Sequence, residues 1–219
     1  ERKLISALDY GDDEAFDDLS WSGFRRSHEI AYRPACPACN ACKSARIDVA
    51  SHQPSRTHRK ILRRNSDLVR SVRINECTTE HWELFDRYIQ SRHGYSEMAM
   101  MTPEDLRMMI EQSTVETGLL EWRDGEGKLQ ACMLFDAMAD GLSAVYSFFA
   151  PEEKQRSLGT FCILDGVNHL RLLGLPKLYL GYWVKGSETM AYKINFSGVE
   201  IHQNGQWEAL KPDQDRPSS

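Results

Sequence analysis

The chain has 219 residues, of which 41% are hydrophobic and 27% charged, and its formal net charge at pH 7 is -5. Such a composition is typical of globular proteins and excludes a chain that is disordered throughout. No apolar run approaches the roughly 20 residues that span a bilayer, and no signal peptide opens the sequence. Six cysteines, three of them clustered, are unlike a secreted disulfide framework. We therefore expect a cytoplasmic protein of one domain, or one domain with an extra lobe, and no membrane partner.

The first part of the chain is acidic over 9–18 and then brings three cysteines at C-x-x-C-x-x-C spacing, Cys36, Cys39 and Cys42. Thiolates at this spacing can surround one soft metal, but a closed zinc site takes four ligands. His28, or a cysteine preceding Glu1, is a candidate for the fourth. The alternative is a tight loop of small residues. A structural zinc ion or an iron–sulfur cluster is therefore one of two hypotheses for this cluster.

A short strand is expected at 45–50, and a strongly basic segment follows at 56–73, with seven basic residues against the single acid Asp67. Four of the cations, Arg56, Lys60, Arg63 and Arg64, recur at helical spacing and predict a helix with a basic face. Arg59 lies in the same segment. A solvated helix is the usual reading of such a run. Against an acidic chain, however, the patch favours an anionic partner, with a nucleic-acid phosphate backbone as the first choice.

The rest of the chain alternates between strand and helix patterns. Strands are predicted at 68–77, 117–122, 129–137, 142–149 and 178–183, and helices at 79–93, from Thr102-Pro103 onward and at 157–173. Asp124-Gly125, Asp140-Gly141 and Asn204-Gly205 mark turns. This order predicts an α+β fold, an acetyltransferase-like mixed sheet with flanking helices. We expect an N-terminal region at 1–67 with the cysteines and the basic helix, the transferase domain at 68–212, and a flexible tail at 213–219.

The stretch 176–196 combines an apolar strand with an unusual density of phenols and cations. Tyr182, Lys185, Tyr192 and Lys193 lie within a dozen residues, around a Gly-Ser break and a helical-looking turn. Phenols and cations at a strand end suit the recognition of a carboxylate or phosphate. An edge strand whose Lys and Tyr tips reach solvent explains the same residues equally well.

The acetyltransferase hypothesis can be tested at the helix start of 157–173. There the superfamily carries a Q/R-x-x-G-x-G/A signature that holds the pyrophosphate of coenzyme A. Arg156 and Gly159 fit this signature, but Phe161 stands where a small residue is required. A bulky ring is expected to crowd the close approach of the pyrophosphate. We therefore expect a different acyl donor and no coenzyme A, the alternative being an ordinary capped helix.

Ordered blocks along nearly the whole chain resemble the arginyl/leucyl-tRNA–protein transferase family, and the short length is similar to its bacterial leucyl branch. The blocks are Gly23-Phe24-Arg25-Arg26-Ser27, Tyr32-Arg33-Pro34 with the three cysteines, Ser55-Arg56 to Asp67-Leu68, Tyr88-x-x-x-Arg92-His93, Asp140-Gly141 to Val145-Tyr146, Arg156 to Thr160, and Gly174-Leu175-Pro176 to Lys193.

The resemblance implies transfer of leucine, ahead of arginine, from Leu-tRNA or Arg-tRNA to the α-amine of proteins that begin with Asp or Glu. The product would carry an N-degron for proteolysis. The ester of the donor is already activated, so no cofactor and no Ser or Cys nucleophile is required. The site must instead supply positioning and charge complementarity.

The implied roles fall into three groups. Catalytic roles are expected for Tyr182, Lys185 and Asp140. Substrate-binding roles are expected for Arg92, His93, Tyr192, Lys193, Asn65 and Asp67. The basic residues Arg56, Arg59, Lys60, Arg63 and Arg64 are expected to hold the tRNA.

Two other functions remain as alternatives to aminoacyl transfer. An acyl-coenzyme A acyltransferase of the same fold would bind coenzyme A. A non-catalytic RNA-binding adaptor built on the cysteines would bind RNA without aminoacyl transfer.

Overall fold

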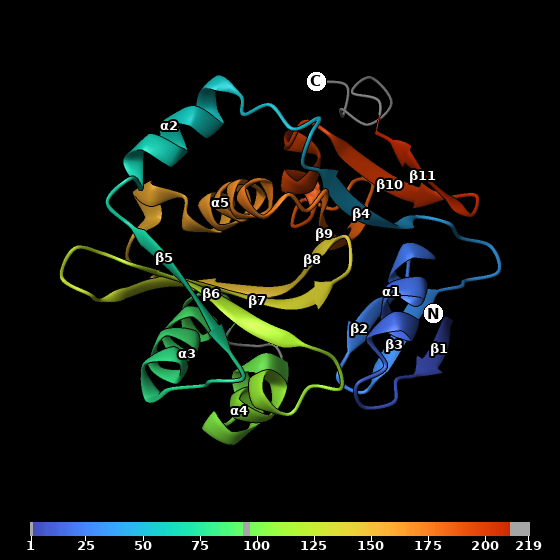
Figure 1. Cartoon of the computed structure of the whole chain (residues 1–219), viewed down its shortest axis with the longest axis horizontal. Coiled ribbons are helices and arrows are strands. Elements are labelled where there is room, and N and C mark those ends of the chain that lie inside the picture. Colours follow the sequence, from blue (N-terminus) through green and yellow to red (C-terminus); the bar gives the residue numbers. More distant parts are fainter. Residues whose placement is uncertain (1, 94–96, 211–219) are drawn as a thin grey trace.

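The computed structural model describes residues 2–93 and 97–210 (Figure 1). The expected tail at 213–219 lies outside this part. The strands are β1 (Lys3–Ala7), β2 (Arg25–Ser27), β3 (Ile30–Pro34), β4 (Cys42–Asp48), β5 (Val69–Ile74), β6 (Thr117–Arg123), β7 (Leu129–Met138), β8 (Gly141–Phe149), β9 (Lys177–Val184), β10 (Val199–Gln203) and β11 (Gln206–Ala209). The helices are α1 (Asp13–Trp21), α2 (Arg56–Arg64), α3 (Thr79–His93), α4 (Pro103–Glu111) and α5 (Leu158–Leu173), with short 3-10 turns η1 (Glu97–Met100), η2 (Lys154–Arg156) and η3 (Ala191–Asn195).

Among the described strands, eight form one sheet in the order β11-β10-β4-β9-β8-β7-β6-β5. All neighbours in this sheet are antiparallel except β8 and β9, which are parallel and are connected through α5. A parallel pair needs such a crossover, because a short turn cannot reverse the chain twice. Helices α5 and α2 lie on one side of the sheet, and α3 and α4 lie on the other (Figure 1). The predicted α+β fold is confirmed.

The core explains why the central strands read as continuous apolar runs. Nearly every residue of β6 and β7 is buried, since helices cover both faces there. Trp122 of β6 and Phe148 of β8 are fully buried. Helix α4 begins as its sequence predicts, with a capping box in which Thr102 and Asp105 each bond the other's backbone N–H.

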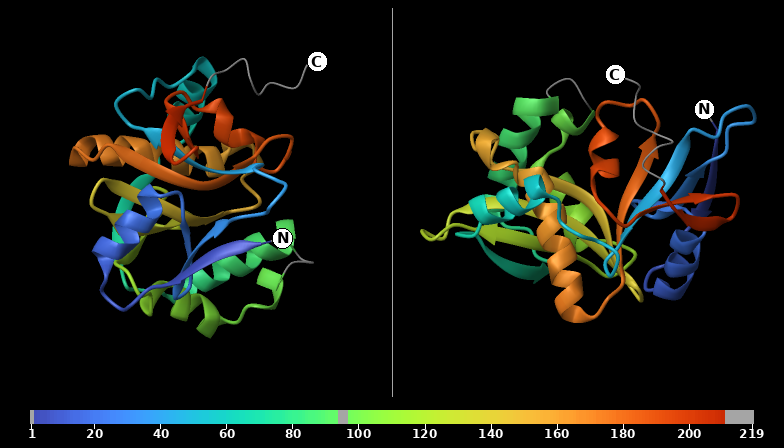
Figure 2. Two further views of the ribbon diagram at one scale, coloured as in Figure 1. Left: turned by 90° about the vertical axis from the view of Figure 1, so that its right-hand side faces the viewer. Right: turned by 90° about the horizontal axis from the view of Figure 1, so that it is seen from above.

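A three-stranded sheet in the order β1-β3-β2 packs with α1 beside the β4–β10–β11 end of the main sheet (Figure 2). Phe16 and Tyr179 share a buried cluster at this junction. Arg26 and Asp136 form a fully buried ion pair at 2.5 Å across it. The residues before 68 also contribute β4, which pairs with both β9 and β10 inside the main sheet.

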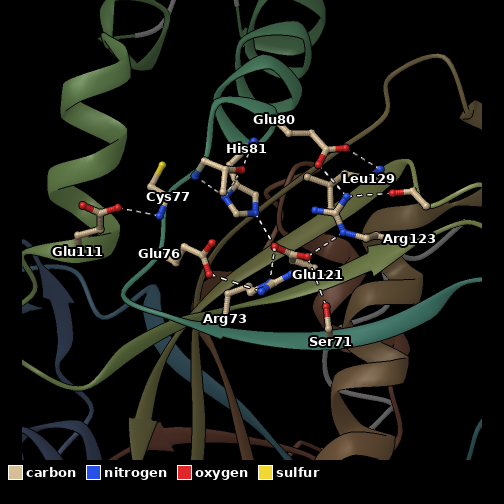
Figure 3. A network of polar contacts seen from close by, with 12 residues as sticks. Ser71, Arg73, Glu76, Cys77, Glu80, His81, Glu111, Glu121, Arg123 and Leu129 are labelled. Carbon is tan, nitrogen blue, oxygen red and sulfur yellow. Dashed lines mark hydrogen bonds and ion pairs between the residues drawn. The ribbon is translucent and has the colours of Figure 1, made fainter.

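A buried polar network fixes the start of α3 against the edge of the sheet (Figure 3). The backbone N–H of Thr78 donates to His81 Nδ1 at 2.9 Å, so the ring hydrogen of a neutral His81 is on Nε2. Nε2 lies 2.7 Å from the Glu121 carboxylate, to which Arg123 also donates at 3.0 Å. Because α3 is held at this end, its last turns are presented to the middle of the sheet, where Tyr88 and Arg92 are found.

Candidate functional site

The two parallel strands separate soon after they pair. β8 and β9 match only at Gly141↔Lys177, Leu142↔Leu178 and Ser143↔Tyr179. Beyond these positions a cavity of about 560 Å³ opens. Its walls come from the second half of β8, the first turn of α5, the last turns of α3, Leu180 of β9 and η3. The loss of the strand ladder therefore creates the space in which a substrate can lie.

The first turn of α5 forms one wall of this cavity. Ser157 is the N-cap, with φ 54°, and makes no side-chain capping bond. Leu158, Gly159 and Thr160 line the cavity, and the N–H groups of a first turn have no intrahelical partner. Gly159 is required here, because a Cβ would stand 2.9 Å from the Phe149 ring. This wall combines the positive end of a helix with a glycine that permits close packing.

The expectation that Phe161 blocks this helix end is wrong. Phe161 is 4% exposed, its ring packs edge-on against Trp122 at 5.9 Å, and it does not line the cavity. A side chain in the first turn of a helix can face either the core or the cavity. The spacing of a sequence signature does not say which. Arg156 likewise turns towards α2 and donates to Asn65 Oδ1 at 2.8 Å.

The cavity wall is rich in cations. Arg92, Lys154 and Lys193 line it, with Glu153 as the one acid among the described lining residues. Lys193 is 7% exposed, and its Nζ donates to the Tyr182 carbonyl at 2.5 Å. Burial, and then the positive charge of Arg25, lowers the pKa of Lys193 to about 7. At neutral pH the amine is therefore only partly protonated, and an anion that enters the cavity favours its charged form.

Arg92 and Tyr192 line the same cavity as Lys193, so three of the predicted substrate-binding residues are brought to one cavity. The Arg92 guanidinium lies 5.2 Å from the centre of the Phe149 ring, and Lys193 Nζ lies 5.9 Å from that of Tyr192. His93 ends α3, but its side chain lies outside the described residues.

Two further phenols line the cavity, Tyr88 and Tyr146, to which the sequence assigned no role. The Tyr146 hydroxyl is buried and has no hydrogen-bond partner among the described residues. Burial raises the pKa of both phenols, which keeps them protonated. The signal for Tyr88 was available, because it precedes Arg92 by four positions and therefore shares its helix face.

The three residues expected to be catalytic do not line this cavity. The Tyr182 hydroxyl donates to the Tyr32 carbonyl at 2.7 Å, beside a smaller cavity of about 300 Å³. Lys185 is exposed in the turn after β9. Asp140 precedes β8 and accepts from the Tyr179 hydroxyl at 3.0 Å. Tyr182 contributes through its backbone carbonyl, which holds Lys193.

Asn65 and Asp67 connect elements and also lie outside the cavity lining. Asn65 is fully buried, and its Nδ2 donates to the carbonyls of Ile61 and Arg156, each at 2.9 Å. Asp67 forms an ion pair with Arg156. These bonds tie the end of α2 to the segment that leads into α5 and the cavity.

Helix α2 matches its prediction from Arg56 to Arg64. Ser55 caps it by accepting from His58 N–H at 3.1 Å, and His58 and Ile61 form its buried side. The five cations expected to hold tRNA are all exposed: Arg56, Arg59, Lys60, Arg63 and Arg64. Since α2 packs on α5, this basic surface lies on the same side of the sheet as α5.

The cysteines do not gather into a ligand set. Within residues 2–93 and 97–210, no three His, Cys, Asp or Glu side chains lie close enough together to hold a metal ion. Cys39 is exposed, and Cys36 Sγ lies 3.8 Å from the Arg2 carbonyl. Cys36, Cys39 and Cys42 alone therefore do not fit a zinc ion or an iron–sulfur cluster.

No helix in the described part of the chain is long and apolar enough to cross a membrane.

Two solved structures share the fold of this chain at low sequence identity. FemX aligns over 90% of this chain and 70% of its own, with a TM-score of 0.51 and 10% identity. The C-terminal domain of a putative lysylphosphatidylglycerol synthetase from Agrobacterium fabrum aligns over 87% and 57%, with a TM-score of 0.51 and 13% identity. These likenesses show the fold alone, and with the sheet topology they confirm the predicted α+β architecture, a mixed sheet with flanking helices.

Sequence comparison defines the family. The model described as "Arginine-tRNA-protein transferase, N terminus" matches residues 1–60, and the one described as "Arginine-tRNA-protein transferase, C terminus" matches residues 80–203. The chain belongs to the arginine-tRNA-protein transferase family. It is 47% identical over 223 residues to an aspartate/glutamate leucyltransferase of Phenylobacterium zucineum, covering 99% of this chain and 87% of the relative. A relative of the same description from Caulobacter vibrioides is 48% identical over 216 residues, covering 96% and 77%.

Proposed function

We propose that this protein transfers leucine from Leu-tRNA to the α-amine of proteins that begin with Asp or Glu. The observation that carries the proposal is the buried Lys193 in a cation-lined cavity at the separated strands, in a chain 47% identical to an aspartate/glutamate leucyltransferase. The product then begins with leucine, which we propose marks it for proteolysis. A charged tRNA donor supports a cytoplasmic location for the reaction.

The chemistry is an aminolysis. The acceptor α-amine attacks the ester carbonyl of the donor, the new C–N bond forms, and the C–O bond to the 3′ oxygen of the terminal ribose breaks. The proton lost by the amine ends on that oxygen. The α-amine has a reference pKa of about 7.7–8.0, so it needs only mild assistance. The cavity must mainly hold the two reacting atoms together, which is the largest contribution that such a site can make.

The acceptor carboxylate is recognised by Lys193, with Arg92 as its partner. An Asp or Glu side chain differs from Asn or Gln by a full negative charge, and a cation in a desolvated site detects that difference. Binding of the carboxylate favours the protonated form of Lys193, whose pKa burial holds near 7 in the free protein. The unpartnered hydroxyl of Tyr146 is available for a polar group of either substrate.

The cavity also suits leucine better than arginine as the transferred residue. Val145, Ile163 and Leu180 supply apolar wall. An arginyl side chain would instead bring a guanidinium among Arg92, Lys154 and Lys193, with Glu153 as the lining acid. Like charges in a partly desolvated site are costly. The basic surface of α2 then holds the tRNA itself.

The proposal is tested by incubating the protein with Leu-tRNA and Arg-tRNA separately, each with a peptide that begins with Asp. Mass spectrometry should detect a peptide extended by one leucyl residue, and little or no arginyl product. Coenzyme A serves as the control ligand. Transfer from neither tRNA, together with tight binding of coenzyme A, would favour the acyl-coenzyme A alternative.

A further inference from the structure

We infer that Arg25 is a positioning residue for the transfer site: its guanidinium holds β8 and β9 apart and supports the part of β9 whose Tyr182 carbonyl holds Lys193. This inference rests on the proposed function. Arg25 belongs to β2 of the small sheet, so it would also give that sheet a part in the reaction.

The guanidinium lies where the ladder between β8 and β9 stops. The last matched pair is Ser143↔Tyr179. At this point Arg25 Nη1 donates to Ser143 Oγ at 3.1 Å, and Nη2 donates to the Ala144 carbonyl at 2.8 Å. Arg25 thus satisfies the Ala144 carbonyl, a backbone acceptor of β8 beyond the last pair matched with β9, and it also bonds the Ser143 side chain.

The other side of the guanidinium faces β9. A Cβ at Gly181 would stand 3.2 Å from Arg25 Nη2, and Gly181 has φ +78°. Glycine allows both the backbone conformation and the close approach. Contacts to Ser143 and Ala144 on one strand and to Gly181 on the other show that the guanidinium fills the gap between them.

Lys193 is attached to the same part of β9. Its Nζ bonds the carbonyl of Tyr182, the residue after Gly181. The positive charge of Arg25 adds to burial in lowering the pKa of Lys193. The other charged and titratable groups around Lys193 come from α3, β8, β9, the segment before α5 and η3. They are Tyr88, Arg92, Tyr146, Tyr182, Glu153, Lys154 and Tyr192.

The small sheet holds Arg25 firmly in this position. Arg26, the next residue, is buried and paired with Asp136 of β7 at 2.5 Å. Tyr32, which faces Arg25 across the β2–β3 ladder, accepts from the Tyr182 hydroxyl at 2.7 Å. The backbone that carries Arg25 is therefore held through its neighbours, by Arg26 to β7 and by Tyr32 to β9.

The first test replaces the guanidinium. Arg25→Ala should lower the rate of leucyl transfer by roughly tenfold to a hundredfold, the effect of losing charged hydrogen bonds, without changing tRNA affinity. Guanidinium ion, added below denaturing concentration, should restore part of the rate. Arg33→Ala is the matched control, because Arg33 is on the same small sheet and does not line the large cavity; its guanidinium donates to the Ser22 carbonyl and lies over the Phe24 ring.

The second test measures how the charge of Arg25 affects the protonation of Lys193. Removing the positive charge of Arg25 in Arg25→Met should move the protonation midpoint of Lys193 to higher pH in an NMR titration of its side chain. Arg25→Lys should leave the midpoint close to that of the unchanged protein. The pH midpoint of the acceptor KM should move in the same direction as the NMR midpoint.

These readouts separate the inference from the proposed function. If the unchanged protein transfers no leucine, the proposed function fails, while the NMR midpoints still report on Arg25. The inference is overturned if folded Arg25→Ala transfers normally, or if Arg25→Met leaves the Lys193 midpoint unmoved. The inference also fails if activity is lost, guanidinium ion does not restore it and the Lys193 midpoint does not move. Arg25 would then only stabilise the fold. If Arg25→Ala does not fold, the Arg25→Met and Arg25→Lys titrations decide.

Discussion

The burial of Lys193 makes its charge costly, and the same burial suits the residue to the recognition of a carboxylate. A lysine at the surface stays protonated to far above neutral pH and discriminates weakly, since water screens its charge. Inside the cavity, burial lowers the pKa of Lys193 to about 7. The bond to the Tyr182 carbonyl holds the amine in place in either protonation state.

This residue predicts the pH dependence of acceptor binding. As pH rises above 7, free Lys193 loses its proton, and an acceptor carboxylate must then bind together with proton uptake. The KM for an Asp-starting peptide should therefore rise by up to roughly tenfold for each further pH unit. Lys193→Met should remove this dependence, while Lys128→Met, at an exposed lysine, should retain it. An unchanged slope in Lys193→Met would contradict the assignment.

At the scale of elements, α2 is built as a separate contact surface. Its buried side is made by His58 and Ile61, and its cations lie on the exposed side, where Arg59 also donates to the Pro54 carbonyl and Arg64 to the Gln155 carbonyl. Replacing Arg56, Lys60, Arg63 and Arg64 by alanine should weaken tRNA binding. It should also reduce the slope of log affinity against log salt by roughly one per lost contact. Arg107→Ala on α4 is the control, and an unchanged slope in the fourfold variant would sink the idea.

The network at the start of α3 makes a second prediction at this scale. Burial raises the pKa of Glu121, but the bonds from Arg123 and His81 outweigh burial and leave this pKa below its usual value. Its contribution to stability is therefore present at neutral pH and lost as pH falls through the lowered pKa. Glu121→Leu leaves the buried His81 Nε2 without its partner, whereas Arg123 keeps Glu80 and Arg73 keeps Glu76. It should cost about 1–3 kcal/mol of unfolding free energy in a urea titration.

Glu104 supplies the control for Glu121, because its ion pair with Arg107 at 3.1 Å is exposed. Glu104→Leu should cost no more than about 1 kcal/mol in the same urea titration. Equal losses in the two variants would show that the network of Figure 3 does not anchor α3.

For the molecule as a whole, sequence predicted the elements that local signals specify. The capping Thr102 with Pro103, the helix at 79–93 and the Asn204-Gly205 turn all depend on neighbours in the chain, and each is found where expected. Lys193, Tyr192 and Arg92 were found through composition and resemblance, and the structure brings them to one cavity.

Long-range features escaped sequence reasoning. The strands β1, β2 and β3 have three to five residues each, and their pairing depends on contacts that no local pattern encodes. The roles of Arg25 and Tyr146 require the separation of β8 from β9, which is visible only once both strands are placed. The prediction about Phe161 was wrong for a related reason, because the position of a residue in a motif does not give the direction of its ring.

The central claim is that Lys193 recognises an acidic first residue in the cavity and so selects the protein that receives leucine. The direct measurement is the ratio of transfer efficiency from Leu-tRNA to two peptides that differ only in Asp or Asn at the first position. Losing a charge-assisted bond costs about 1.5–3 kcal/mol, so the unchanged protein should prefer Asp by roughly tenfold to a hundredfold. In Lys193→Met the preference should vanish, with the fold and tRNA affinity intact. A variant that still transfers normally and still rejects Asn would contradict the account and place the acceptor pocket elsewhere.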